Sequence, residues 1–63
     1  MPKTVDVQIV LQDADAYALA LFLKRVGWSD IRSNAQDEQE AYDMRDAIEA
    51  AARALAEAGY APR

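Results

Sequence analysis

The chain has 63 residues, carries a formal net charge of −4, and contains neither cysteine nor histidine. A chain this short forms one domain at most, and it buries only about 60% of the surface that its unfolded form exposes. Without cysteine or histidine, disulfides and the usual metal sites are excluded, so self-association is the remaining route to extra stability. We therefore expect one domain over residues 1–63, a homodimer, no cofactor and no metal.

The N-terminal residues MPKTVDVQIV lack the order of a charged and then an apolar segment that a signal peptide has. No apolar run approaches the ~20 residues that a membrane-spanning helix needs. We expect a complete, soluble chain of the cytoplasm that does not contact a membrane.

The charge is unevenly distributed along the chain. Residues 1–33 hold four basic and four acidic residues, whereas residues 34–63 hold three basic and seven acidic ones, so the second half carries the whole net charge of −4. Nucleic-acid binding draws on clustered Lys and Arg, so this distribution argues against nucleic acid as a partner.

Apolar and polar side chains alternate over about residues 4–11, TVDVQIVL. This is the pattern of a half-buried β-strand of ordinary length. A single strand needs partners for its backbone N–H and C=O groups, so we expect two copies to pair antiparallel across the homodimer. The predicted dimer strand presents Val5, Val7, Ile9 and Leu11. The alternative is a monomer whose strand adds to the edge of a partner's sheet.

A first helix is predicted over about residues 13–26. Asp13 is a good N-cap, and Leu19, Phe22, Leu23 and Val26 follow the i, i+3, i+4, i+7 spacing of one helix face. This face should pack inward.

A second helix is predicted over about residues 37–58, after a polar connection over about residues 27–36. Asp37 as N-cap and Glu40 at the N3 position make a variant of the capping box. Ser33 and Gln36 offer the same pattern one turn earlier, so that start remains an alternative. A seam of small and apolar residues follows: Ala41, Met44, Ile48, Ala51, Leu55 and Ala58. The predicted fold class is α+β and mostly helical, a β-α-α protomer.

A glycine followed by an aromatic residue occurs twice, as Gly27–Trp28 and as Gly59–Tyr60. At a helix C-terminus, a left-handed glycine lets the next residue pack back onto its own helix. We expect both pairs to be such endings, with Trp28 packed on Leu23. The alternative makes Trp28 an anchor for a partner, because Trp and Arg are enriched at binding hot spots.

The sequence contains no recognisable catalytic motif. The serines have no histidine to activate them, so we expect no enzyme. Asp13 and Asp15 could suggest a metal site, but two carboxylates alone are a weak signal, and a cap with a first-turn acid accounts for both.

The predicted partner-binding surface is an acidic run at the start of the second helix. It would dock on a basic surface of another protein. The alternative is that these acids only complement the helix dipole and keep the chain soluble. The residues of the run are Asp37, Glu38, Glu40, Asp43 and Asp46, and Trp28 with its flanking Arg25 and Arg32 completes the predicted contact set.

Two resemblances bear on function. Strand–helix–helix resembles the ribbon-helix-helix repressors, which implies a DNA-binding regulator or antitoxin as the alternative function. The segments FLKRVGWSD, EAYDMRDA and ALAEAGYAPR are more similar to a family of short uncharacterised proteins from bacterial and prophage genomes. That resemblance implies a mobile-element setting but no established activity. Small acidic phage proteins, anti-CRISPR proteins among them, often inhibit host machinery, and on that association we expect an inhibitor of this kind. The resemblance assigns no site residues.

Overall fold

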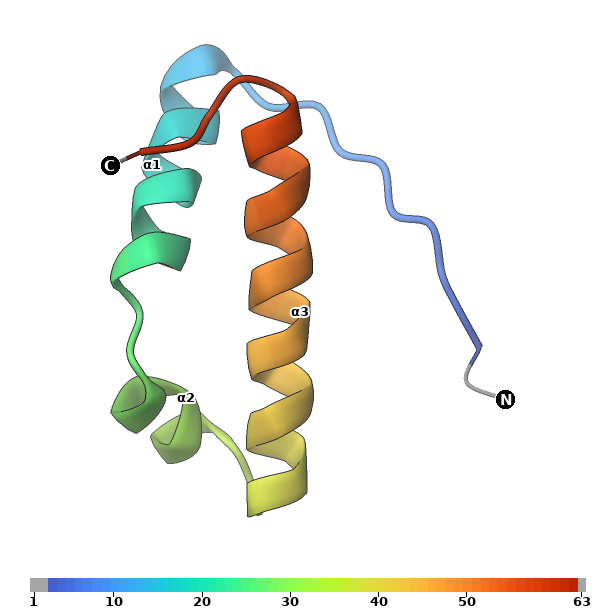
Figure 1. The fold of residues 1–63 in the computed structure, drawn as a ribbon, viewed down its shortest axis with the longest axis vertical. Coiled ribbons are helices and arrows are strands. Elements are labelled where there is room, and N and C mark those ends of the chain that lie inside the picture. Colours follow the sequence, from blue (N-terminus) through green and yellow to red (C-terminus); the bar gives the residue numbers. More distant parts are fainter. Residues whose placement is uncertain (1–2, 63) are drawn as a thin grey trace.

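The computed structural model describes residues 3–62, and this part of the chain folds into three α-helices (Figure 1). Helix α1 spans Asp13–Arg25, α2 spans Trp28–Asn34 and α3 spans Glu38–Glu57. α1 and α3 lie side by side and run in opposite directions, while α2 packs against the end of α3 where that helix begins. The fold of the described residues is therefore all-α.

Residues 3–11 form an extended arm, which leaves the start of α1 and runs along the side of α3 that is remote from α1 (Figure 1). The predicted α+β fold with a paired N-terminal strand is wrong, because residues 3–62 contain no strand. Alternation alone does not make a strand: backbone hydrogen bonds to a second extended segment hold it, and the described chain supplies no such segment. The residues concerned are Val5, Val7, Ile9 and Leu11.

Helix α1 begins at Asp13 itself, so the prediction of Asp13 as the N-cap is wrong by one position. Gln12 has extended backbone and occupies the N-cap position, although its side chain makes no capping hydrogen bond. Asp13 and Asp15 therefore lie in the first turn, and Lys24 and Arg25 lie in the last. Acids at the start and bases at the end both complement the helix dipole, which stabilises this short helix.

The predicted connection over residues 27–36 contains α2. Gly27 has a φ of −103° and is the N-cap of α2, so it does not form a left-handed ending of α1. The predicted packing of Trp28 back onto Leu23 as such an ending is wrong, because Trp28 is the first residue of a new helix. Asp30 stabilises this start: its carboxylate accepts a hydrogen bond from the Gly27 N–H at 3.2 Å, which satisfies a donor that helix starts leave unpaired.

Both ends of α3 form as the sequence predicts. Asp37 is the N-cap, and its carboxylate accepts a hydrogen bond from the Glu40 N–H at 2.8 Å. At the other end Gly59 has a φ of +104°, and the Tyr60 N–H donates to the Leu55 carbonyl oxygen at 2.8 Å. The predicted left-handed helix ending at Gly59 is thus confirmed.

The core between the helices is small and consists mostly of alanine. Alanine lets α1 and α3 approach closely, but each alanine buries little apolar area. Phe22, which the sequence places on the inner face of α1, is instead 61% exposed. The buried residues are Ala16, Ala20, Ile31 and Ala41.

Candidate interaction surface at the α2–α3 end

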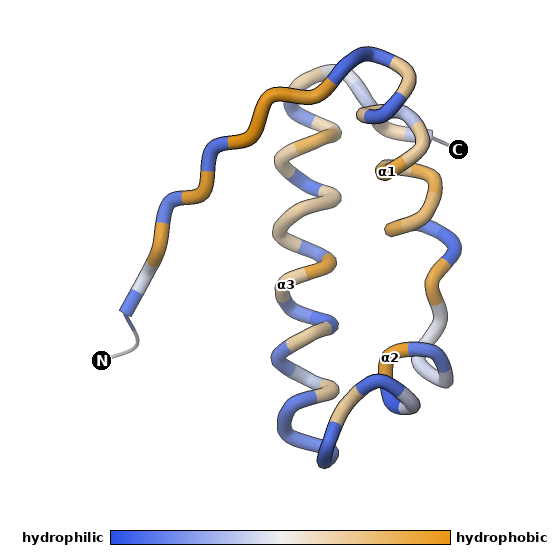
Figure 2. The backbone as a smooth tube through the Cα atoms, turned by 180° about the vertical axis from the view of Figure 1, so that it is seen from behind, coloured by the Kyte–Doolittle hydropathy of each residue, from blue (hydrophilic) through white to orange (hydrophobic). Residues whose placement is uncertain are grey.

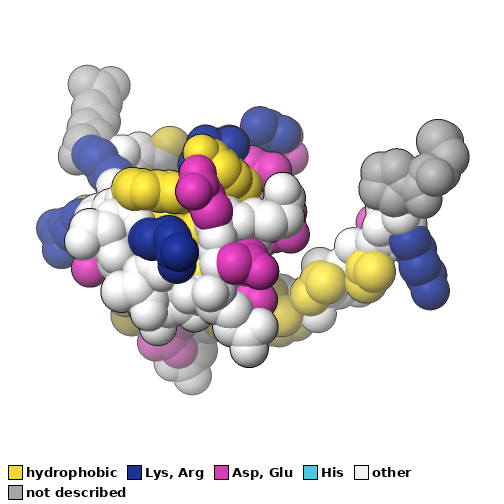
Figure 3. All heavy atoms as spheres, turned by 90° about the horizontal axis from the view of Figure 1, so that it is seen from below, with side chains coloured by type: hydrophobic (Ala, Val, Ile, Leu, Met, Phe, Trp, Pro, Cys, Tyr) yellow, Lys and Arg dark blue, Asp and Glu magenta, His cyan; other side chains and the backbone are white. Residues whose placement is uncertain are grey.

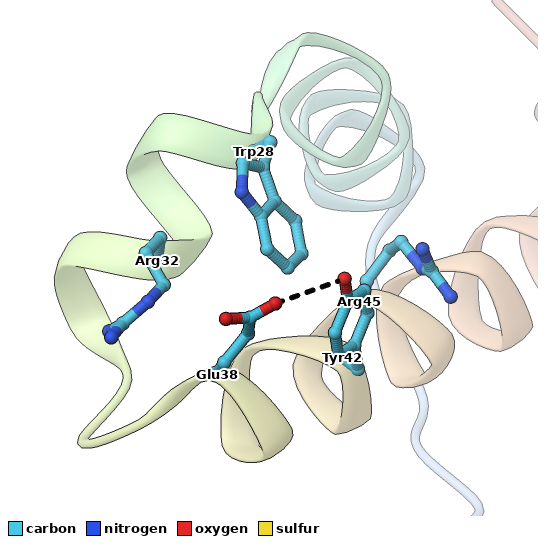
Figure 4. Close-up of a pocket in the computed structure, with 5 residues that line it drawn as sticks. All are labelled: Trp28, Arg32, Glu38, Tyr42 and Arg45. Atoms are coloured by element: carbon cyan, nitrogen blue, oxygen red, sulfur yellow. Dashed lines mark hydrogen bonds between the residues drawn. The ribbon is translucent and has the colours of Figure 1, made fainter.

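A cavity of about 510 Å³ opens to solvent between α2 and the first turns of α3 (Figure 4). Its lining combines two aromatic rings with three charged side chains. We call it the aromatic cavity, and its residues are Trp28, Arg32, Glu38, Tyr42 and Arg45.

The helical repeat explains why these five side chains meet. On α3, Glu38, Tyr42 and Arg45 follow the spacing i, i+4, i+7, so they share one face of the helix. On α2, Trp28 and Arg32 are four residues apart and share a face in the same way. The packing of α2 against α3 brings the two faces together.

The two aromatic rings that line the cavity contact each other. The ring centroids of Trp28 and Tyr42 lie 5.1 Å apart with an interplanar angle of 38°, within the usual range of aromatic pairs. The guanidinium carbon of Arg45 lies 5.0 Å from the centroid of the Tyr42 ring, which is a cation–π distance. Trp28 is still 42% exposed and Tyr42 is 39% exposed, so a partner could reach both rings.

The two arginines of the cavity already have acceptors within their own helices or turns. Arg32 donates to the Ala35 carbonyl oxygen at 3.3 Å, and Arg45 pairs with Asp46 at 3.2 Å. Glu38 accepts a hydrogen bond from the Tyr42 hydroxyl at 3.3 Å (Figure 4). An ionised carboxylate has about four acceptor positions, so Glu38 keeps capacity for a further donor.

Most of the predicted acidic run lies outside the cavity and makes local hydrogen bonds. Asp37 caps α3, and the Glu40 carboxylate accepts from the Gln36 N–H at 3.2 Å. Asp43 accepts from the Gln39 side-chain amide at 3.2 Å. Helix capping and neighbouring side chains therefore account for these acids, although they still make the surroundings of the cavity negative.

The structure brings together three of the eight predicted contact residues, namely Trp28, Arg32 and Glu38. Arg25 ends α1 and does not line the cavity, and neither do the other four acids. Sequence reasoning missed Tyr42 and Arg45. Their spacing from Glu38 places both residues on the same face of α3. That spacing indicates a site only when it is known that α2 packs against this face. Figure 3 views this end of the molecule, where hydrophobic side chains lie beside both acidic and basic ones.

Two further observations concern what the described residues do not form. Between residues 3 and 62, no three Asp or Glu side chains gather closely enough to hold a metal ion. No helix in the same range combines the length and the apolar character that a membrane crossing requires.

The fold and the site define a small all-α protein with an exposed aromatic and charged surface at one end. The chain belongs to a family of unknown function, DUF7706, whose family model matches residues 1–63. No curated protein and no solved structure matches it. The prediction of an uncharacterised family is thereby confirmed, while the bacterial or prophage setting stays a prediction.

Proposed function

We propose that this chain is a non-enzymatic protein-interaction module that binds a basic segment of a partner protein at the aromatic cavity. The observation that carries the proposal is the exposed contact between Trp28 and Tyr42, beside the carboxylate of Glu38. Trp, Tyr and Arg are the residues most enriched among those that dominate binding energy.

The contents of the cavity favour a cationic partner side chain. The exposed surface of the Trp28 indole can take a guanidinium or ammonium group by a cation–π contact. Glu38 lies at the rim with acceptor capacity left over, so the same cation can pair with its carboxylate. The arginines of the cavity make an anionic ligand a poorer fit, because each already has a local acceptor.

The acidic surroundings strengthen the same preference. Asp37 caps α3, and Glu40 and Asp43 lie on its first turns, close in sequence to the cavity residues of that helix. Their combined field attracts basic surfaces and speeds encounter with them, and salt screens it over about 8 Å at physiological ionic strength. In this proposal the aromatic pair forms the centre of the contact, and the acidic run surrounds it.

The alternative of a ribbon-helix-helix regulator gains no support from the fold, because that layout needs paired strands and residues 3–62 form none. DNA binding is measured directly in the experiment below. Inhibition of host machinery also stays a prediction, which becomes testable once a partner is identified: saturating amounts of the chain should then block the partner's activity.

The experiment uses a random peptide library presented to the immobilised chain. Selected peptides should be enriched in Arg and Lys, and they should change the fluorescence of Trp28, which is the single tryptophan of the chain. Titration of that signal gives the dissociation constant. We expect Tyr42→Ala to weaken binding about tenfold or more, which corresponds to at least ~1.4 kcal/mol.

Matched controls separate the cavity from its surroundings. Tyr17→Ala removes another exposed tyrosine, on α1 and away from the cavity, and should leave the affinity unchanged. Glu38→Gln should cost more affinity than Asp43→Asn, because only Glu38 lines the cavity. Selection of acidic peptides, equal binding by Tyr42→Ala, or tight sequence-specific binding to a DNA duplex would each contradict the proposal.

A further inference from the structure

A second surface of the molecule, distinct from the aromatic cavity, has no partner within the described chain. A groove of about 960 Å³ lies between the extended arm, α3 and the start of α1. None of its lining residues is charged, although 29% of the chain is charged. The lining residues are Val5, Val7, Gln8, Ile9, Leu11, Ala16, Leu19, Ala47, Ala50, Ala51, Ala54, Leu55, Ala58 and Tyr60.

The α3 side of this groove is a continuous face of alanine. Ala51 and Ala58 belong to the seam of small and apolar residues that the sequence shows along this helix, yet both are exposed, and Ala52 is the more covered residue. The alanine face thus lies on the opposite side of α3 from the aromatic cavity residues and is open to solvent. Its residues are Ala47, Ala50, Ala51, Ala54 and Ala58.

The arm on the other side of the groove exposes large apolar side chains. Val5, Val7 and Ile9 are 73%, 79% and 63% exposed. Figure 2 shows these hydrophobic positions alternating with hydrophilic ones along the arm, and Figure 3 shows hydrophobic side chains along the part of the arm that stands clear of the helices. So much exposed apolar area in one segment indicates an interaction site.

The total surface shows that the uncovered area is large enough for a stable dimer. The chain exposes 5419 Å², whereas a compact monomer of 7.0 kDa exposes about 4,000 Å². The surplus of roughly 1,400 Å² exceeds the ~800 Å² that each partner buries in a standard interface. The radius of gyration agrees, at 12.7 Å against about 11 Å for a compact chain of this length.

We propose that a second copy of this chain fills the groove, with the arm of each copy packed along the alanine face of the other. The lengths are comparable: residues 5–11 of the arm extend about 23 Å at ~3.3 Å each, and residues 47–58, which carry the alanine face, rise about 18 Å at ~1.5 Å each. The side chains of the arm of one copy contact α3 of the other copy, so the arms need not pair with each other as strands.

The same chain supplies both halves of this interface, so the arrangement closes as a two-fold dimer. In a two-fold dimer the arm of each copy meets the groove of the other, and no unfilled copy of either surface remains. No charge is buried, since the groove lining carries none, so the repulsion between the two net charges of −4 acts only outside the contact, where salt screens it. The dimer also adds apolar burial that the alanine core of one copy lacks.

The first test measures the molar mass at micromolar concentration by sedimentation equilibrium, with helix content followed by circular dichroism. The wild-type chain should have about twice the mass of 7.0 kDa. Val7→Asp should raise the dimer dissociation constant about 100-fold or more, because the charge would be buried without a partner. Ala51→Glu should do the same from the α3 side of the interface.

The chain offers a matched control for each variant. Val10 is 96% exposed and does not line the groove, so Val10→Asp should leave the dimer intact. Ala56→Glu makes the same change on α3 as Ala51→Glu, at an exposed position outside the groove. A wild-type monomer with full helix content, or a dimer that tolerates Ala51→Glu, would overturn the proposal.

The second test locates the arm by disulfide cross-linking, which is clean because the chain has no cysteine of its own. Val7→Cys and Ala51→Cys are placed on separate chains, mixed and oxidised. Because a disulfide needs Cα atoms within about 7 Å, the mixture should give a linked pair with one copy of each variant. The pair Val10→Cys and Ala56→Cys should link poorly.

The cross-linking result also decides whether the arm is exchanged. A chain carrying both Val7→Cys and Ala51→Cys should form its disulfides between copies. A disulfide within one chain at monomer mass would show that the arm folds onto its own α3 and would overturn the proposal. Because Tyr42 lies outside the groove, the Tyr42→Ala variant should still form the dimer. Loss of peptide binding at the aromatic cavity can therefore be distinguished from loss of the dimer.

Discussion

The two glycine–aromatic junctions have the same sequence pattern and opposite structural roles. Gly27–Trp28 begins a helix: Gly27 has a φ of −103°, and Trp28 is the first residue of α2. Gly59–Tyr60 ends one: Gly59 has a φ of +104°, and the Tyr60 N–H returns to the Leu55 carbonyl oxygen. The dipeptide itself permits either role.

The residues that follow each glycine decide between the two roles. After Gly27, Asp30 satisfies the free N–H of the new helix start, and Ile31 gives that helix a buried side chain. After Gly59, Pro62 disfavours any continuation of the helix. A glycine–aromatic pair therefore predicts a helix ending only where no capped and partly buried helix can start behind it.

The largest expected effect comes from removing the buried anchor of α2. Ile31 is the only buried residue larger than alanine in the part of the chain that the structure describes. Ile31→Ala should lower the free energy of unfolding by about 2–4 kcal/mol, within the range for large-to-small core changes. Thermal unfolding followed by circular dichroism measures it. We also expect Ile31→Ala to disrupt the contact between Trp28 and Tyr42, which should shift the tryptophan fluorescence. A melting temperature equal to that of the wild type would show that α2 does not depend on Ile31.

A smaller effect is expected at the glycine that ends α3. Gly59→Ala should destabilise the fold by about 1 kcal/mol, because an alanine at positive φ is strained even though a Cβ there would meet no neighbour within 4 Å. Gly59→Asn should cost less, since asparagine tolerates the left-handed region better than alanine. Urea unfolding of the three proteins gives the differences.

The matching change at the other junction sharpens the comparison. A Cβ on Gly27 would lie 3.8 Å from an Asp30 carboxylate oxygen, which is an ordinary contact, and the backbone there suits any residue. Gly27→Ala should therefore change stability by no more than about 0.5 kcal/mol, as for an unstrained surface position. If Gly27→Ala proved as costly as Gly59→Ala, the two junctions would be alike after all.

The smallest effect concerns pH at the second junction. The Tyr60 hydroxyl donates a hydrogen bond to Asp13, which links the C-terminal tail to the start of α1. This hydrogen bond, with some desolvation and the negative charge of Asp13, raises the pKa of Tyr60 above its usual value of 10.0. The stabilisation is fully present below pH 10 and is lost as pH rises through the raised pKa, because the tyrosinate can no longer donate.

Ultraviolet absorbance between pH 8 and 12 checks the direction of that shift. Tyr60 should ionise at a higher pH than an unperturbed tyrosine, and Tyr60→Phe should remove this late step from the titration curve. The melting temperature of Tyr60→Phe should also fall less than that of the wild type as pH rises over the same range. A Tyr60→Phe titration curve that keeps the late step of the wild type would contradict the contact with Asp13.

The sequence determined the elements whose ends carry their own chemistry. Asp37 with Glu40 marks the start of α3, and Gly59 marks its end, because capping and left-handed glycine are local interactions between residues a few positions apart. Membership of an uncharacterised family was likewise readable from the sequence. Three of the five residues that line the aromatic cavity were also among the predicted contact residues, namely Trp28, Arg32 and Glu38.

Only the tertiary structure decided the features that depend on distant residues. Whether Val5 to Leu11 forms a strand depends on a second segment to pair with, and alternation does not report whether one exists. Tyr42 and Arg45 join the aromatic cavity because α2 packs over their face of α3. Ala51 faces the groove and its neighbour Ala52 faces the interior, because the position of α1 determines which side of α3 is covered. An alanine-rich helix has similar small residues on both sides, so its own sequence cannot choose between them.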